Sequence, residues 1–306
     1  MDVLSDAIMA MRTGVPHSSR TCLPAPWGLR FAPSGGAGFH VVLQGSCWLL
    51  MPEREAIRLN VGDVVFLAHG RGHVIADDPA TPPVDVVQDE SGEWVLTEEA
   101  PPGPGPASVL LCGAYRLSRA RAHPLLSGLP DLVHLPARVG AHPALRATVD
   151  LLGAELDRPG PGSGALVPAL LDAMLLYILR AWLHEHAGQA VTGWAAALAD
   201  PAIAGALHAL HRDPAHAWTV QALGARAGLS RAAFARRFAA VVGQPPLAYL
   251  TWWRMTVAGR LLATGEAPLR VVAESSGYSS EFAFARAFKR EFGMPPGRYR
   301  RTRSRP

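Results

Sequence analysis

The chain is poor in cysteine, has a single lysine, and contains no long apolar run. Its 3 cysteines, Cys22, Cys47 and Cys112, are too few for a disulfide-based secreted scaffold. No stretch approaches the roughly twenty apolar residues of a membrane span. The N-terminus lacks the basic segment and apolar segment of a secretory signal. We therefore expect a cytoplasmic protein with reduced thiols, no membrane segment and no cofactor.

Sequence arrangements typical of enzymes are also missing. No Ser/His/Asp set, paired carboxylates or glycine-rich phosphate loop stands out. The length of 306 residues leaves room for more than one domain. The sequence therefore favours a binding protein over a catalyst.

Charge divides the chain into two unequal parts. Residues 198–306 carry 16 Lys and Arg against 6 Asp and Glu, a net charge of +10. Residues 1–197 carry 13 against 19, a net charge of −6. A basic domain attracts phosphates, so the C-terminal third is a candidate for binding nucleic acid.

One sequence pattern occurs twice in this basic third. The stretch from Phe234 to Tyr249 recurs from Phe284 to Tyr299 with an offset of 50, and upstream Gly228 corresponds to Gly277 with an offset of 49. In each copy the glycine permits a left-handed turn and the following serine can cap a helix. Two phenylalanines four residues apart then share a buried helix face. The pattern predicts two helix-turn-helix motifs, joined by a helix near residues 247–264.

The second helix of each motif presents an outward face suited to DNA. Small residues let a helix lie deep in the major groove, and arginine can bind guanine or a phosphate. A solvated helix face remains an alternative for any single arginine. The candidate DNA-binding residues are Arg231, Ala232, Ala235, Arg236, Ser280, Glu281, Phe282, Arg286, Lys289 and Arg290.

Residues 20–115 have a β pattern. Short runs of alternating or continuous apolar residues separated by glycine turns predict strands at 39–43, 47–51, 55–59, 64–67, 74–75 and 108–113. Such a series suggests a jelly roll or cupin barrel. The Pro- and Gly-rich segment 77–106 is predicted to be a loop. Helices are expected at 143–156 and 167–186, and the apolar excess of the second could be core or a dimer interface.

The C-terminal third resembles the AraC/XylS family of bacterial transcription regulators. In that family the two exposed recognition helices make the base contacts, which by position implies Ala232, Ala235, Arg236, Glu281, Phe282 and Arg286. The resemblance also implies a promoter operator, RNA polymerase as a partner, a homodimer, and most often activation. The residues that carry it are Trp218–Val220, Ala227–Ser230, Phe234–Phe238, Arg254, Met255, Ala258, Leu261, Leu262, Gly277–Ser280 and Phe284–Pro296.

The N-terminal half is similar to the cupin-type sensor domain of some AraC-like regulators. In the second cupin motif Gly62, Gly70 and His73 fit, whereas Ala68 replaces the usual proline. The first motif offers only His40 among its strands. His40 and His73 are thus the first metal candidates, but two histidines are too few to assert a metal site. The other matching residues are Ala25–Gly28, Phe39–Trp48, Gly62–Leu67, His69 and Leu111–Tyr115.

The resemblance also gives the cysteines a possible role. Some regulators with this domain pair respond to oxidants through cysteines in corresponding places, which implies sensing by Cys22 and Cys112 through a disulfide. Arg20 beside Cys22 favours a reactive thiolate there. Buried thiols, with a small molecule in the barrel as the true signal, are at least as strong an alternative.

These observations predict an α+β protein. Residues 1–118 form a cupin-like β-barrel sensor, 119–197 a helical linker and dimerisation segment, and 198–306 an all-α domain with two helix-turn-helix motifs. The predicted function is a sequence-specific transcription regulator, not an enzyme, controlled by a ligand or an oxidant. A cupin enzyme with an accessory DNA-binding domain and an architectural DNA binder are the rival interpretations.

Overall fold

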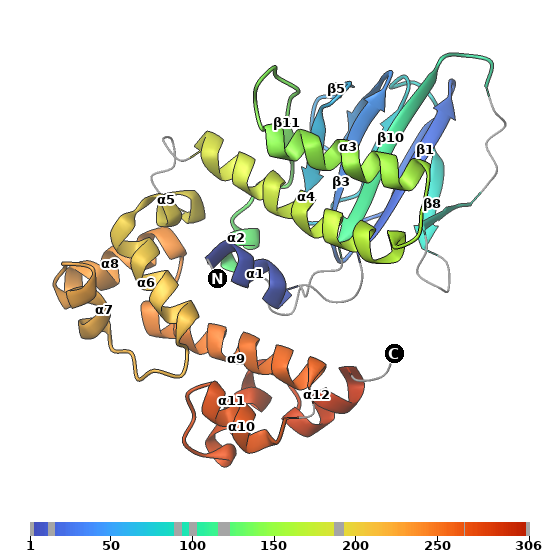
Figure 1. Ribbon diagram of the computed structural model, residues 1–306. Helices are drawn as coiled ribbons and strands as arrows, with labels where there is room; N and C mark the ends of the chain where they lie inside the picture. Colours follow the sequence, from blue (N-terminus) through green and yellow to red (C-terminus); the bar gives the residue numbers. More distant parts are fainter. Residues whose placement is uncertain are drawn as a thin grey trace. The chain divides into compact units, whose positions relative to one another are not determined.

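The computed structural model describes residues 3–11, 16–88, 94–97, 103–115, 123–186, 193–265 and 267–303. The chain divides into two compact units (Figure 1). The β unit comprises Arg12–Arg119 and Leu129–Glu185. The helical unit comprises Met1–Met11, Ala120–Gly128 and His186–Pro306. The fold class is α+β, as the sequence predicts.

Two β-sheets form the β unit. The five-stranded sheet has the order β1 (His17–Pro24), β10 (Ala107–Tyr115), β3 (Ala37–Gln44), β6 (Val64–Leu67) and β11 (Val133–Leu135). The six-stranded sheet has the order β5 (Ile57–Asn60), β4 (Ser46–Leu50), β7 (His73–Ala76), β2 (Gly28–Phe31), β8 (Val84–Gln88) and β9 (Trp94–Leu96). All pairings are antiparallel except that of β2 with β8.

The core of the β unit lies between the two sheets. Val42, Val65 and Leu110 of the five-stranded sheet belong to the same buried cluster as Leu49 and Ile75 of the six-stranded sheet. The cluster explains the alternation of apolar residues that predicts the strands.

The prediction of a loop over residues 77–106 is wrong, because β8 and β9 lie within it. The Pro and Gly content of the segment is typical of a loop, so the pattern does not predict these two short strands. They form by pairing, β8 with β2 and β9 with β8.

Two helices of the β unit, α3 (Pro143–Asp157) and α4 (Ser163–His186), lie across the five-stranded sheet (Figure 1). The Tyr115 hydroxyl donates to the Leu171 carbonyl at 2.8 Å, which fixes α4 to the end of β10. By length and composition alone α4 could cross a membrane, although the sequence predicts no such segment. Its apolar side is partly used as core, since Leu171 and Ile178 are fully buried.

The helical unit contains both predicted helix-turn-helix motifs. The first is α7 (Val220–Arg226) with α8 (Arg231–Val242), and the second is α10 (Leu269–Ser275) with α11 (Glu281–Phe292). The long helix α9 (Pro246–Thr264) joins them. The remaining helices are α1 (Val3–Met11), α2 (Pro124–Ser127), α5 (Gly193–Ala199), α6 (Pro201–Arg212) and α12 (Pro296–Arg303).

The helical unit also takes in residues from outside the predicted range 198–306. Helix α1 buries Val3, Leu4 and Ile8 and packs with α6 and α9, whereas the sequence assigns residues 1–118 to the barrel. Helix α2, from the predicted linker, packs with α5. Burial of the apolar side of α1 accounts for its place among these helices.

Candidate nucleic-acid interface and barrel pocket

The two helix-turn-helix motifs have the same turn geometry. Gly228 and Gly277 have φ angles of 67° and 75°, which is the left-handed region that glycine enters without a Cβ clash. Ser230 accepts a hydrogen bond from the backbone N–H of Ala233 at 3.3 Å, and Ser280 accepts one from Ala283 at 3.4 Å. Each serine therefore caps its recognition helix as predicted.

Matching phenylalanine pairs fix the orientation of both recognition helices. Phe234 and Phe238 have ring centroids 5.6 Å apart at 49°, and Phe284 and Phe288 have the same distance and angle. All four rings are fully buried. Because this face is buried in the core, equivalent positions of the two helices face outward in both motifs.

The predicted DNA-binding residues lie on these outward faces. Arg231, Ala232 and Arg236 of α8 are exposed, and Ala235 is half-buried. On α11 the side chain of Phe282 is 81% exposed. The exposed residues in and before α11 also include Ser280, Glu281, Arg286, Lys289 and Arg290.

Two arginines have structural roles that the sequence does not reveal. The Nε of Arg237 lies 2.6 Å from Asp200 Oδ2, which ties α8 to the start of α6. Arg254 of α9 donates from Nε to the Pro214 carbonyl at 2.6 Å and from a terminal nitrogen to the His216 carbonyl at 2.8 Å. A Cβ atom on Gly277 would lie 2.7 Å from that guanidinium, so Arg254 also braces the second turn.

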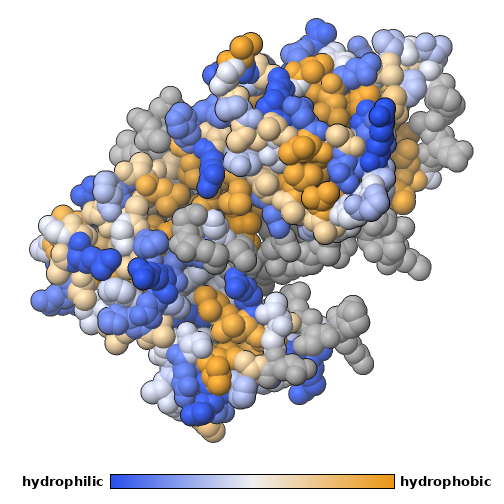
Figure 2. All heavy atoms as spheres, viewed as in Figure 1, coloured by the Kyte–Doolittle hydropathy of each residue, from blue (hydrophilic) through white to orange (hydrophobic). Residues whose placement is uncertain are grey.

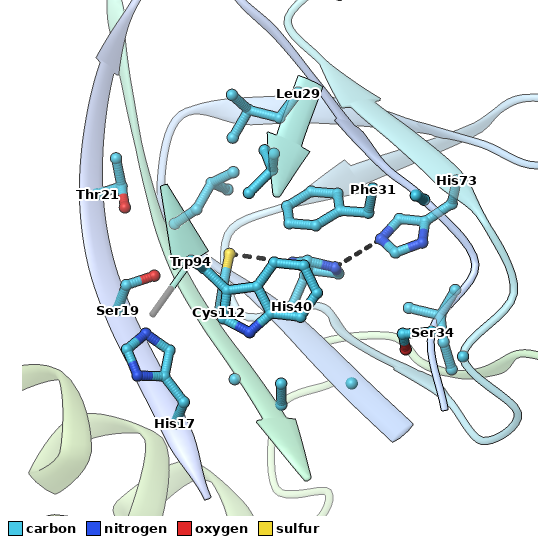
Figure 3. A pocket seen from close by; sticks show the side chains of 18 of the residues that line it. His17, Ser19, Thr21, Leu29, Phe31, Ser34, His40, His73, Trp94 and Cys112 are labelled. Carbon is cyan, nitrogen blue, oxygen red and sulfur yellow. Dashed lines mark hydrogen bonds between the residues drawn. The ribbon is translucent and has the colours of Figure 1, made fainter. Parts of the chain in front are cut away.

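The β unit holds a cavity of about 170 Å³ (Figure 3). His40, His73 and Cys112 line it together with the aromatic rings of Phe31 and Trp94. Phe31 stacks on His73 with centroids 4.8 Å apart at 9°. The other apolar lining residues include Leu23, Leu29, Leu67, Val86, Val95, Leu96 and Leu110. The cavity is therefore mostly apolar, and His40, His73 and Cys112 form a group of titratable side chains on its lining, which also includes His17 and Arg71.

Those titratable side chains form a hydrogen-bonded chain. His73 Nδ1 lies 3.0 Å from the Arg71 carbonyl, so this nitrogen must be the donor. His73 Nε2 then accepts from His40 Nε2, 2.8 Å away, and His40 Nδ1 accepts from the Cys112 thiol at 3.0 Å. Each ring thus has one tautomer, and the chain is satisfied with all members neutral.

Burial keeps these groups uncharged. It lowers the pKa of His73 to about 4 and that of His40 well below its usual value, and the charge of His73 lowers the His40 value further. Burial raises the pKa of the Cys112 thiol to about 12. At neutral pH this group therefore consists of a thiol and two neutral imidazoles.

The metal candidates His40 and His73 come together on the cavity lining. Their Nε2 atoms bond to each other, and His40 Nδ1 is used by Cys112. Within the described residues no group of three or more His, Cys, Asp or Glu is placed to hold an ion. A cupin-type metal would need more ligands than this pair offers.

The predicted Cys22–Cys112 disulfide does not fit the fold. In the register of β1 and β10, Ser19 lies opposite Cys112, whereas Cys22 lies opposite Val109. Three residues along a strand separate the two positions by about 10 Å, beyond the roughly 7 Å Cα distance that a disulfide spans. Cys22 is also exposed, whereas Cys112 faces the cavity. The sequence could not show this, because the register depends on the folded sheet.

Both halves of the chain match known protein families. Residues 2–184 match the cupin family, and residues 223–302 match a helix-turn-helix domain family. An AraC-like transcription regulator of Streptomyces lividans is 38% identical over 98% of each chain. The RCS-specific HTH-type transcriptional activator RclR of Escherichia coli strain K12 is 30% identical over 98% of this chain and 97% of its own. The DNA-binding domain of AdpA, solved with a target DNA, is 35% identical over 34% of this chain and 92% of its own, with a TM-score of 0.32.

The doubled helix-turn-helix unit and the cupin-like unit define a DNA-binding transcription regulator. The chain belongs to the AraC-like family of these regulators.

Proposed function

We propose that this regulator activates transcription from an operator bound by α8 and α11, in response to a small, uncharged effector in the cavity of the β unit. The observation that carries the proposal is the chain from Cys112 through His40 to His73, which is neutral and faces a largely apolar cavity. A charged effector would lose its hydration without gaining an opposite charge from this group. The guanidinium of Arg71, also on the lining, is 61% exposed and pairs with Asp131 at 2.9 Å.

The size of the cavity limits the effector. An apolar cavity of about 150 Å³ accommodates a benzene ring. The value of about 170 Å³ here therefore favours an effector built on one ring or a short chain.

The DNA part of the proposal rests on charge and on the repeated geometry. Arg236 and Arg286 occupy equivalent exposed positions on the two recognition helices. The net charge of +10 over residues 198–306 supplies attraction to the phosphates.

The test uses the purified full chain. Operator DNA is selected from a random library, and transcription by RNA polymerase is then measured with uncharged single-ring compounds and with their carboxylate analogues. Ser19→Phe, which fills the cavity from β1, should abolish the response to the uncharged compounds. Cys22→Ser, at an exposed position of the same strand, should keep it. Carboxylates that bind as tightly as the uncharged compounds would contradict the proposed effector class.

A second signal, an oxidant, is favoured by the position of the Cys112 sulfur on the cavity lining. The similarity to an RCS-specific activator supports it. Hypochlorous acid would convert the thiol to a sulfenic acid and release HCl, so that sulfur is oxidised and chlorine reduced. Cys112→Ser should then remove the response of transcription, whereas Cys22→Ser should not. A response that survives Cys112→Ser would exclude this signal.

The proposal includes a cytoplasmic homodimer that contacts RNA polymerase. Apolar side chains gather over α3 and α4 (Figure 2), where Leu151 is 59% and Leu166 49% exposed. Exposed leucines on two neighbouring helices favour an interface. Leu166→Glu should shift the mass in analytical ultracentrifugation from dimer to monomer, and an unchanged mass would place the interface elsewhere.

A further inference from the structure

Phe282 stands apart from the other phenylalanines of the repeat. Its ring is 81% exposed, whereas Phe284 and Phe288 on the same helix are fully buried. It lies in the first turn of α11, directly after Glu281, and two residues along a helix place it on the side away from Phe284. A large apolar side chain left in water at this place is available to a partner.

The surroundings of Phe282 indicate which partner. At helical spacing Phe282 shares a face with Arg286 and Lys289, both exposed. A ring at the N-terminal end of a basic stripe suits a helix that enters the major groove with its first turn, where base edges are read and cations reach phosphates. A protein surface or a membrane would be matched by a wider apolar patch than one ring.

One base offers a surface that matches the ring. In the major groove thymine is the base that carries a C5 methyl group, an apolar surface that a phenylalanine ring can contact. We propose that Phe282 selects thymine in the half-site read by α11, through contact with its methyl group. This inference rests on the proposed binding of operator DNA by the two recognition helices.

The repeat supplies an internal comparison. The position equivalent to Phe282 in α8 is Ala232, whose side chain is a single methyl group. The residue before Ala232 is Arg231, whereas the residue before Phe282 is Glu281, so the neighbouring charge is opposite in the two helices. The two half-sites therefore differ in sequence, and the requirement for thymine belongs to the half-site of α11.

The experiment measures affinity of the full chain for its selected operator and for operators in which single thymines are replaced by deoxyuridine. Removing the methyl group keeps the hydrogen-bonding groups of the base. We expect replacement of one thymine of the α11 half-site by deoxyuridine to lower the affinity of the chain for the operator about fourfold. This is the equivalent of about 0.8 kcal/mol for one buried carbon. Phe282→Ala should bind both operators equally, and Phe282→Leu should keep part of the difference. Because the ring is exposed, thermal melting of the variants should match the parent chain.

The outcomes separate this inference from the proposed function. Failure to select any operator would overturn the DNA-binding proposal and this inference together. A selected operator whose affinity is the same with deoxyuridine at every position would overturn only the role of Phe282. Loss of transcription without loss of DNA affinity in Phe282→Ala would assign the ring to RNA polymerase and would also overturn the inference.

Discussion

Oδ2 of Asp6, in the N-terminal helix α1, lies 3.4 Å from Nδ1 of His211 at the end of α6. His211 Nε2 lies 2.6 Å from the Tyr249 hydroxyl, which is 3.2 Å from His123 Nε2. Because His123 Nδ1 accepts from the Leu125 backbone N–H, its Nε2 must be the donor to Tyr249. The Tyr249 hydroxyl then donates to His211, which leaves the proton of His211 on Nδ1, the nitrogen at ion-pair distance from Asp6. One buried network thus joins α1, α2, α6 and α9.

Replacement of Asp6 tests this network. Asp6→Asn keeps the shape of the side chain but removes the charge that His211 faces, so we expect the free energy of unfolding to fall by about 1–2 kcal/mol. Urea denaturation followed by circular dichroism measures it. Asp150→Asn, at an exposed position of α3, is the control and should change little. An Asp6→Asn protein as stable as its parent would show that Asp6 and His211 do not interact.

The cavity histidines should make stability depend on pH. The pKa of His73 is lowered to about 4 in the folded state, so the unfolded chain takes up the proton at a higher pH than the folded chain. The contribution of neutral His73 to the free energy of unfolding is complete above about pH 6.5 and is lost as the pH falls toward 4. Between pH 7.5 and 5.0 the loss should be about 1–2 kcal/mol, allowing for the partial exposure of the ring. Urea denaturation across this range should give a shallower dependence for His73→Gln, and an equal slope would contradict the lowered pKa.

Two glycines at equivalent turns provide a matched pair. Gly228→Ala places a Cβ in a left-handed conformation with no atom within 4 Å, and should cost about 1 kcal/mol of unfolding free energy. Gly277→Ala adds a collision with the guanidinium of Arg254, which is held by the Pro214 and His216 carbonyls. We expect a further loss of about 1–2 kcal/mol. In an Arg254→Met background the two glycine substitutions should lower the free energy of unfolding by nearly the same amount. If Gly277→Ala still costs more there, its extra cost comes from a contact other than Arg254.

The exposed arginines should divide into two kinds in DNA binding. Arg236→Ala and Arg286→Ala should reduce the preference for the operator over random DNA, with a loss of about 1–3 kcal/mol each on the operator. Arg290→Ala should weaken binding to both DNAs equally and lower the dependence of affinity on salt. Fluorescence anisotropy at several salt concentrations measures both quantities. Equal losses on both DNAs for Arg286→Ala would reassign it to phosphate binding.

Local patterns predict the elements of this protein better than its long-range contacts. The N-caps at Ser230 and Ser280 and the buried phenylalanine pairs follow from residues a few positions apart, so the sequence is enough to place them. The meeting of Asp6 with His211 depends on tertiary packing that no local pattern encodes. The positions of Cys22 and Cys112 could not be predicted from the sequence for the same reason, because they depend on how β1 pairs with β10.

The two units are interleaved along the chain. Residues Met1–Met11 and Ala120–Gly128 belong to the helical unit, so the backbone passes from one unit to the other four times. A fragment beginning at residue 198 would keep both recognition helices but lose α1 and α2, and with them Asp6 and His123 from beside Tyr249. Residues 198–306 therefore make up only part of the helical unit. The N-terminal helix α1, which precedes the barrel in the sequence, therefore belongs to the unit that carries both recognition helices.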